Sequence, residues 1–224
     1  MVIKLIGSGV GAYLLGSLPT GLFWAWLFKG IDVRRAGSGR TGGTNVWRSA
    51  NFGAAFLTAV TDGLKGAAAI WLTHALNLTP WGIAVAGALA IVGHNYSLFL
   101  KFHGGAGTMV SIGVAAALWA SNLPLLALTG AGVGLLVGHA SVASILIALL
   151  LPVIFWVRGE PAYAVAFGLP AMALTLWALR PNIQRLLKGR ERFLPMYLKK
   201  PPLIRLSRHP FRRKEEEEEQ TSEV

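Results

Sequence analysis

The sequence predicts an all-α integral membrane protein with about seven transmembrane helices. Hydrophobic residues make up 54% of the 224 residues and charged residues only 14%, whereas a soluble domain has about 25% charged residues. The apolar stretches are rich in Leu, Ala, Val, Ile and Gly and show no strict alternation with polar residues. Strands of an outer-membrane barrel would alternate in short segments, so helices are expected.

The first span is expected over residues 3–28. The apolar run that ends at Phe28 is too long for the core of a cleavable signal peptide. Further spans are expected at 53–76, 81–100, 109–121, 123–139, 142–157 and 162–179. Several of them are shorter than the ~20 residues that a perpendicular crossing needs. Segments 109–121 and 123–139, which meet at Asn122-Leu123-Pro124, are either two tilted spans or one hairpin that does not cross fully.

Lys and Arg indicate the orientation, because basic loops stay on the cytoplasmic side of a membrane. Basic residues gather after the first span, at Lys101 after the third span and from Arg180 onward, whereas the opposite side holds only Lys4 and Arg158. We therefore expect the N-terminus outside, the C-terminus in the cytoplasm and a location in the inner (plasma) membrane. Residues 1–197 are expected to form the bundle, and residues 198–224 a charged, disordered cytoplasmic tail.

Three polar segments map to the predicted cytoplasmic face. The loop AGSGRTGGTNVWR at 36–48 combines glycines, hydroxyls, an amide and two guanidinium groups, without a carboxylate. The segment at 93–108 runs from a span end into a glycine-rich turn that opens the next helix. Ser141, Ser144 and Asn182 form a third, scattered group. Exposed backbone N–H groups and fixed positive charge suit a phosphate or another oxyanion.

Two charged residues and a histidine lie within predicted spans. Asp62 and Lys65 stand at positions i and i+3, on one helix face. Charges at membrane depth are costly and often functional, yet these two could also form a structural ion pair. His94, at a span end, is either a proton carrier or a hydrogen-bond partner of a neighbouring backbone group.

The residue types exclude several kinds of chemistry. The chain has no cysteine, which excludes disulfides, thiolate nucleophiles and Cys-ligated metals. The histidines do not form metal-ligand spacing with carboxylates, so no metal and no cofactor is expected. No serine has a companion base at helical spacing, which argues against a Ser-His-Asp hydrolase. Nucleic acid is not an expected partner, because the basic residues flank lipid-embedded helices and suit an anionic membrane surface.

Taken together, these segments resemble the bacterial acyl-phosphate:glycerol-3-phosphate acyltransferase family. The resemblance extends to about Glu191 and rests on motifs in the family's order and spacing: GSLPTG at 16–21, AGSGRTGGTNVWR at 36–48, DGLKG at 62–66, GHNYSLFLKFHGGAGT at 93–108, SVASI at 141–145 and PNIQRLLKGRE at 181–191. It implies a seven-helix inner-membrane bundle with a cytoplasmic active site. It also implies acyl transfer from an acyl phosphate to the 1-hydroxyl of glycerol 3-phosphate, which gives lysophosphatidic acid and phosphate without a metal or nucleotide.

The same resemblance assigns roles to individual residues. Those expected to take part in catalysis are Ser38, Asn45, Arg48, Ser144 and Asn182. Those expected to bind substrate are Arg40, Gly43, Thr44, Gly104, Gly105, Gly107, Thr108 and Glu191. Ser38 and Arg48 would hold phosphate, the glycines after residue 103 would line a phosphate-binding turn, and Glu191 would brace the C-terminal segment. No protein base is expected, because substrate phosphate would accept the proton.

Three positions depart from the family's pattern. Ala106 stands where its GGKG motif has a lysine, Arg40 where its SGN motif has an asparagine, and Leu179 where a histidine precedes the last motif. Loss of one charge-assisted contact costs about 1.5–3 kcal/mol, and Arg40 could restore the charge from the opposite loop. One alternative is a divergent, non-catalytic paralogue that binds lipid precursors or a partner. A small anion transporter fits less well, because the predicted outer loops are nearly bare of polar groups.

Overall fold

The computed structural model describes residues 2–198, 202–204 and 206, and all regular structure within them is helical. The long helices are α1 (Val2–Ser17), α2 (Thr20–Lys29), α4 (Phe52–Ala75), α5 (Pro80–Asn95), α6 (Thr108–Leu118), α7 (Leu123–Val137), α8 (Ala140–Val157) and α9 (Ala162–Leu187). A short helix, α3, covers Gly43–Ser49, and single 3-10 turns lie at Val33–Arg35, Leu98–Leu100, Ala120–Asn122 and Pro195–Tyr197. The all-α prediction is confirmed. Most of the predicted tail lies outside the described residues.

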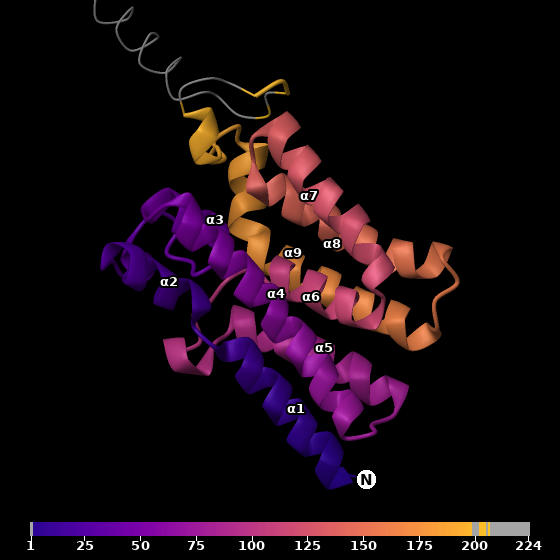
Figure 1. Ribbon diagram of the computed structural model, residues 1–224. Helices are drawn as coiled ribbons and strands as arrows, with labels where there is room; N and C mark the ends of the chain where they lie inside the picture. The colour runs from indigo at the N-terminus through magenta and orange to yellow at the C-terminus, as the bar shows by residue number, and fades with distance from the viewer. Residues whose placement is uncertain (1, 199–201, 205, 207–224) are drawn as a thin grey trace, which may run out of the picture.

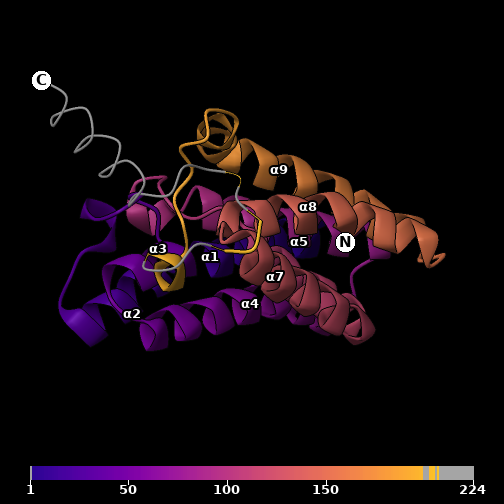
Figure 2. The ribbon, with the colours of Figure 1, turned by 90° about the horizontal axis from the view of Figure 1, so that it is seen from above.

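The helices form one bundle in which α4 and α9 lie on opposite sides (Figures 1 and 2). Helix α5 packs against α1, α4 and α9, and α6 lies along α4. These contacts are close because glycines face backbone: a Cβ at Gly113 of α6 would overlap the carbonyl oxygen of Gly63 in α4. Lipid supplies no hydrophobic drive for helix association, so close backbone approach between small residues stabilises such pairs.

The first predicted span, residues 3–28, is two helices rather than one. Helix α1 ends at Ser17 and α2 begins at Thr20. Pro19 between them has no N–H to donate, and its ring would clash with the preceding turn. At this break the carbonyl oxygen of Leu18 accepts hydrogen bonds from the Thr20 N–H at 2.9 Å and from the Lys65 ammonium at 3.0 Å.

Two other boundaries differ from the expected spans. The break predicted at Asn122-Leu123-Pro124 begins earlier, at the extended residue Trp119, and Pro124 lies in the first turn of α7, where its missing N–H costs nothing. The last helix does not stop at residue 179 but continues through Pro181 to Leu187, and it contains a second internal proline, Pro170. Prolines are tolerated inside membrane helices when neighbouring groups satisfy the freed backbone.

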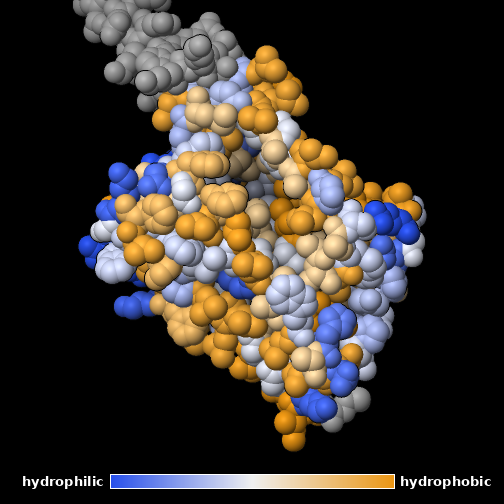
Figure 3. Space-filling view, in the orientation of Figure 1, coloured by the Kyte–Doolittle hydropathy of each residue, from blue (hydrophilic) through white to orange (hydrophobic). Residues whose placement is uncertain are grey.

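Five helical segments of the described chain are long and apolar enough to cross a membrane: Val2–Lys29, Pro80–Leu100, Ala120–Val137, Ala140–Val157 and Ala162–Leu187. Helix α4 has 24 residues but carries Asp62 and Lys65 midway, and α6 has only 11 residues. Seven crossings would include these two helices, and that number stays a prediction. Hydrophobic residues cover much of the face in Figure 3, and hydrophilic ones gather at its edges near α2 and near the α8–α9 turn.

Candidate active site

The loop before α3 is folded around one side chain, Asn45. The two hydrogens of its Nδ2 are shared among the carbonyl oxygens of Val33, Ala36 and Arg40, which lie 3.1, 3.0 and 2.8 Å from the nitrogen. Its Oδ1 accepts a hydrogen bond from the Ser38 N–H at 2.8 Å. Asn45 is buried, whereas Ser38 is exposed at the loop tip. The structure thus places Asn45 as the organiser of the loop, with Ser38 presented at its surface.

The loop also depends on a glycine beside Asn45. Gly37 has a φ of 57°, in the left-handed region, and a Cβ there would overlap the Asn45 Oδ1. Glycine adopts this conformation without steric cost, so the chain can turn tightly around the amide. Gly43 and Thr44 follow in the first turn of α3, and both are half-buried.

The second glycine-rich turn, Gly104–Thr108, lies directly against this loop. The Thr41 N–H approaches the Gly104 carbonyl oxygen at 3.5 Å. Gly107 caps the N-terminus of α6 with a φ of 85°, and Thr108 is the first residue of that helix. The Ser111 hydroxyl donates to the Gly107 carbonyl oxygen at 2.9 Å. Two amide-rich segments that are far apart in sequence therefore meet at one end of the bundle.

Glu191 joins the C-terminal segment to two helices. Its Oε1 accepts hydrogen bonds from the Ser141 hydroxyl at 3.1 Å and from the Asn182 Nδ2 at 2.9 Å. Its Oε2 lies 3.0 Å from the Arg185 Nε. Only 4% of Glu191 is exposed. A buried carboxylate needs this degree of pairing, and the pairing fixes the segment after α9 against α8.

Ser144 lies one helical turn after Ser141, near the other loops. It lines a narrow crevice between α6, α8 and α9 together with Thr108, Ser111 and Thr175. The lining combines hydroxyl groups with aliphatic side chains such as Leu151. Ser144 is thereby placed near Thr108, the last residue of the glycine-rich turn.

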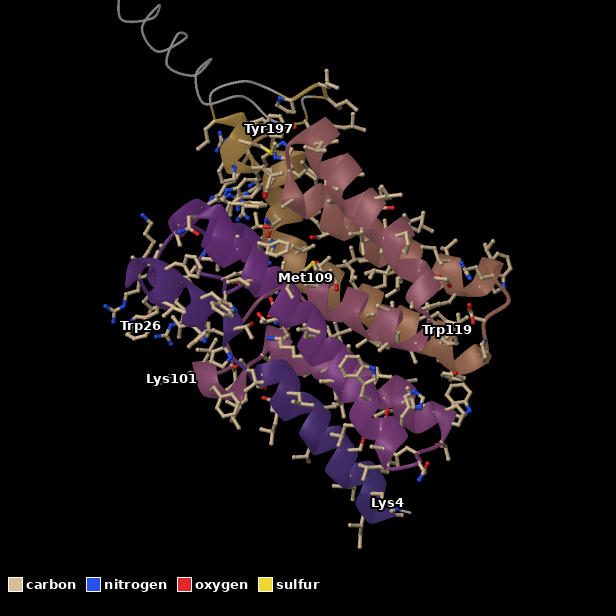
Figure 4. The ribbon with its side chains drawn as sticks, viewed as in Figure 1. Lys4, Trp26, Lys101, Met109, Trp119 and Tyr197 are labelled. Atoms are coloured by element: carbon tan, nitrogen blue, oxygen red, sulfur yellow. The ribbon has the colours of Figure 1, made fainter. Side chains whose placement is uncertain are left out.

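Arg48 turns toward the C-terminal segment. Its guanidinium donates to the carbonyl oxygens of Arg192 and Phe193, at 3.2 Å in each case. Burial lowers the pKa of Arg48, and the Glu191 carboxylate opposes that shift. Figure 4 shows nitrogen atoms crowded where α3 approaches this segment. Arg48 remains a cation at neutral pH, because the pKa of arginine lies far above 7.

Arg40 reaches across to α9. Its Nη2 donates to the carbonyl oxygen of Ala178, next to Leu179. Burial lowers the pKa of Arg40, and Arg185 and Arg180 lower it further, whereas Glu191 raises it. These influences show that guanidinium groups from the first loop and from α9 share one electrostatic neighbourhood. Leu179 itself is buried and carries no polar group, and Ala106 is half-buried in the glycine-rich turn.

Sequence reasoning did not identify His139 as one of the polar residues of this site. Its Nδ1 donates to the Arg192 carbonyl oxygen at 3.1 Å, and its ring lies against that of Phe193, with centroids 4.4 Å apart and planes tilted by 32°. Burial lowers its pKa. The available signal was a polar residue directly before the long apolar helix α8. Arg185, which is paired with Glu191, appeared in the sequence only as one of many basic residues near the C-terminus.

These features define a class: a polytopic helical membrane protein with a cationic, amide-lined site at one end of its bundle. Comparison with known proteins gives the family. The family model for glycerol-3-phosphate acyltransferase matches residues 6–189. The glycerol-3-phosphate acyltransferase of Synechococcus sp. (strain JA-3-3Ab) is 40% identical over 185 residues, which cover 82% of this chain and 90% of the relative. The enzyme of the same name from Rubrobacter xylanophilus is 39% identical over 181 residues, covering 80% of this chain and 90% of that enzyme.

Solved structures agree. The crystal structure of PlsY (YgiH), an integral membrane glycerol 3-phosphate acyltransferase, in its glycerol 3-phosphate form superposes with a TM-score of 0.79 at 32% identity, covering 84% of this chain and 94% of that chain. Its lysophosphatidic acid form gives a TM-score of 0.78 at 31% identity, with the same coverage. The chain belongs to the glycerol-3-phosphate acyltransferase family.

Proposed function

We propose that this protein transfers the acyl group of an acyl phosphate to the 1-hydroxyl of glycerol 3-phosphate, in the inner membrane and with its site facing the cytoplasm. The observation that carries the proposal is the contact between the loop at 36–48 and the turn at 104–108, beside guanidinium groups from α9. The names of relatives support glycerol 3-phosphate as the acceptor of the acyl group, because family members are called glycerol-3-phosphate acyltransferases.

The chemistry needs few groups from the protein. The glycerol oxygen attacks the acyl carbonyl carbon, the bond between that carbon and the phosphate oxygen breaks, and phosphate leaves with the electron pair. The hydroxyl proton passes to a substrate phosphate oxygen. The protein must hold two anions close together and stabilise negative charge on the carbonyl oxygen. Arginines and clustered backbone N–H groups meet both requirements.

The proposed roles follow the arrangement of the site. Ser38 and Arg48 hold one phosphate, with Arg40 supplying the charge that Ala106 and Leu179 do not. Asn45 acts by fixing the loop that carries Ser38, with Gly43 and Thr44 beside it. A phosphate binds to the turn that contains Gly104, Gly105, Gly107 and Thr108, and Ser144 lies next to this turn. The hydrogen bond from Asn182 to Glu191 holds the Asn182 side chain, so that it is oriented toward the acceptor substrate.

The direct test is turnover by the purified protein. Palmitoyl phosphate and radiolabelled glycerol 3-phosphate are supplied in detergent or nanodiscs, and labelled lysophosphatidic acid and released phosphate are measured in equal amounts. Product that requires both substrates supports the proposal. A protein with a cooperative melting transition that forms no product would instead be the non-catalytic paralogue.

A further inference from the structure

A buried charged cluster lies beneath the glycine-rich turn. The Lys65 ammonium is 2.9 Å from the Asp62 Oδ1, and both side chains are at most 5% exposed. The same Asp62 oxygen accepts a hydrogen bond from the Thr20 hydroxyl at 2.5 Å, and Lys65 also donates to the Leu18 carbonyl oxygen. The cluster therefore ties α4 to the break between α1 and α2. Breaking such a buried pair is costly because one charge stays uncompensated.

His94 lies between this cluster and the turn. Its Nδ1 is 3.6 Å from the Asp62 Oδ1, and only 6% of its side chain is exposed. On the other edge of the ring, Nε2 fills the space where a Cβ of Gly105 would be. The carbonyl oxygen of His94 accepts the Gly105 N–H at 3.1 Å and fills the space beside Gly104. One residue thus contacts both glycines, with its backbone and with its ring.

We propose that His94 is a positioning residue: its ring, held in place by the Asp62–Lys65 pair, sets the position of Gly104–Thr108 relative to the loop at 36–48. This proposal rests on the proposed function, in which that turn receives a substrate phosphate. Lys101–His103, directly before the turn, are exposed, whereas Gly105 within it is buried against the His94 ring. Because the His94 ring contacts this turn, a shift of the ring displaces the backbone amides of Gly104–Thr108.

The test uses two neighbouring glycines as a matched pair. Gly105→Ala places a methyl group on the His94 ring, and Gly104→Ala places one on the His94 backbone. Each single variant should lower kcat/KM for glycerol 3-phosphate by at least about tenfold, because a misplacement of about 1 Å in a substrate-positioning group can cost about a hundredfold. Adding His94→Ala removes only the ring. Activity should therefore return in the Gly105→Ala double variant to at least the level of His94→Ala alone, and should not return in the Gly104→Ala double variant.

His94→Ala alone should raise KM for glycerol 3-phosphate more than it lowers kcat, with His94→Gln intermediate. Its fold should persist, because Asp62 keeps Lys65 and Thr20 as partners; melting curves in detergent check this. Full activity of Gly105→Ala, or equal behaviour of the two double variants, would overturn the positioning role.

A second readout separates this proposal from the proposed function. Glycerol 3-phosphate should raise the melting temperature of the wild type, and that rise should disappear in Gly105→Ala and return in the double variant with His94→Ala. If this pattern appears while the wild type forms no lysophosphatidic acid, the positioning role stands and the acyltransferase proposal fails. If the wild type turns over but the pattern is absent, the positioning role fails alone. If the wild type neither turns over nor shows the rise, both fail.

Discussion

Replacing Asn45 by alanine removes the hydrogen bond accepted from Ser38 and the two N–H groups that are shared among three carbonyl oxygens. A typical intramolecular hydrogen bond contributes about 1 kcal/mol, so the loop at 36–48 loses roughly 3 kcal/mol of ordering free energy. By mass action this lowers the population of the ordered loop by up to about a hundredfold. The long helices do not depend on Asn45, so the melting temperature should change far less than the activity.

The assay is steady-state acyl transfer at saturating palmitoyl phosphate, combined with hydrogen exchange. Asn45→Ala should lower kcat/KM for glycerol 3-phosphate by one to two orders of magnitude, that is about tenfold to a hundredfold, and should remove protection of the Ser38 amide. Asn51 offers a matched control, because its Oδ1 accepts one hydrogen bond, from the Ala54 N–H at 2.8 Å, and caps α4. Asn51→Ala should cost about 1 kcal/mol of stability and leave Ser38 protected. An Asn45→Ala enzyme within about threefold of wild-type kcat/KM would refute the reasoning.

Three further predictions concern charge, packing and pH. Arg40→Ala should lower kcat/KM for glycerol 3-phosphate about tenfold to a hundredfold, the cost of one charge-assisted contact, whereas the exposed Arg35→Ala should not; equal kinetics would show that Arg40 supplies no charge to the site. Gly113→Leu should abolish stable folding in detergent because its side chain meets backbone of α4, whereas Gly132→Ala, with open space around its Cβ, should melt like the wild type. Burial lowers the pKa of His139, so the unfolded chain takes up this proton first as pH falls; its contribution to stability is complete above its ordinary pKa of 6.5 and declines below that value. The melting temperature should therefore drop between about pH 7.5 and 5.5, and drop less in His139→Gln; an unchanged pH slope would contradict this assignment.

The spans could be predicted from composition, because apolar runs of membrane length have few alternatives. The break at Pro19 could not, since a proline inside an apolar run is compatible with a kinked helix as well as with two helices. The end of α9 illustrates the same ambiguity: Pro181 reads as a stop signal, yet the helix passes through it to Leu187. In both places packing against other helices decides the outcome, and a single sequence does not contain that packing.

The site divides in a similar way. The loop and turn were recognisable by their glycines, hydroxyls and arginines, which are local properties. The contact of Arg40 with Ala178 joins residues 138 positions apart, and the contacts of Glu191 with α8 and α9 depend on how these helices pack. His94 is a further case: its side chain was expected to carry a proton or to bond a neighbouring backbone group, but its ring faces Asp62, and the hydrogen bond with the Gly105 N–H is made by its carbonyl oxygen. Residue spacing in the sequence does not specify which groups the ring and the carbonyl of His94 will contact.

The hydrogen bonds from Arg48 to the C-terminal segment have a consequence for biosynthesis. The partner of Arg48 lies 145 positions later in the chain, and the backbone of Leu194 closes on Gly138 only after that segment exists. While the ribosome is still inserting α8 and α9, the first loop has emerged but these acceptors have not. A partly inserted chain therefore presents Arg48 without its final partners, and the completed site arises only after Arg192 and Phe193 have been synthesised.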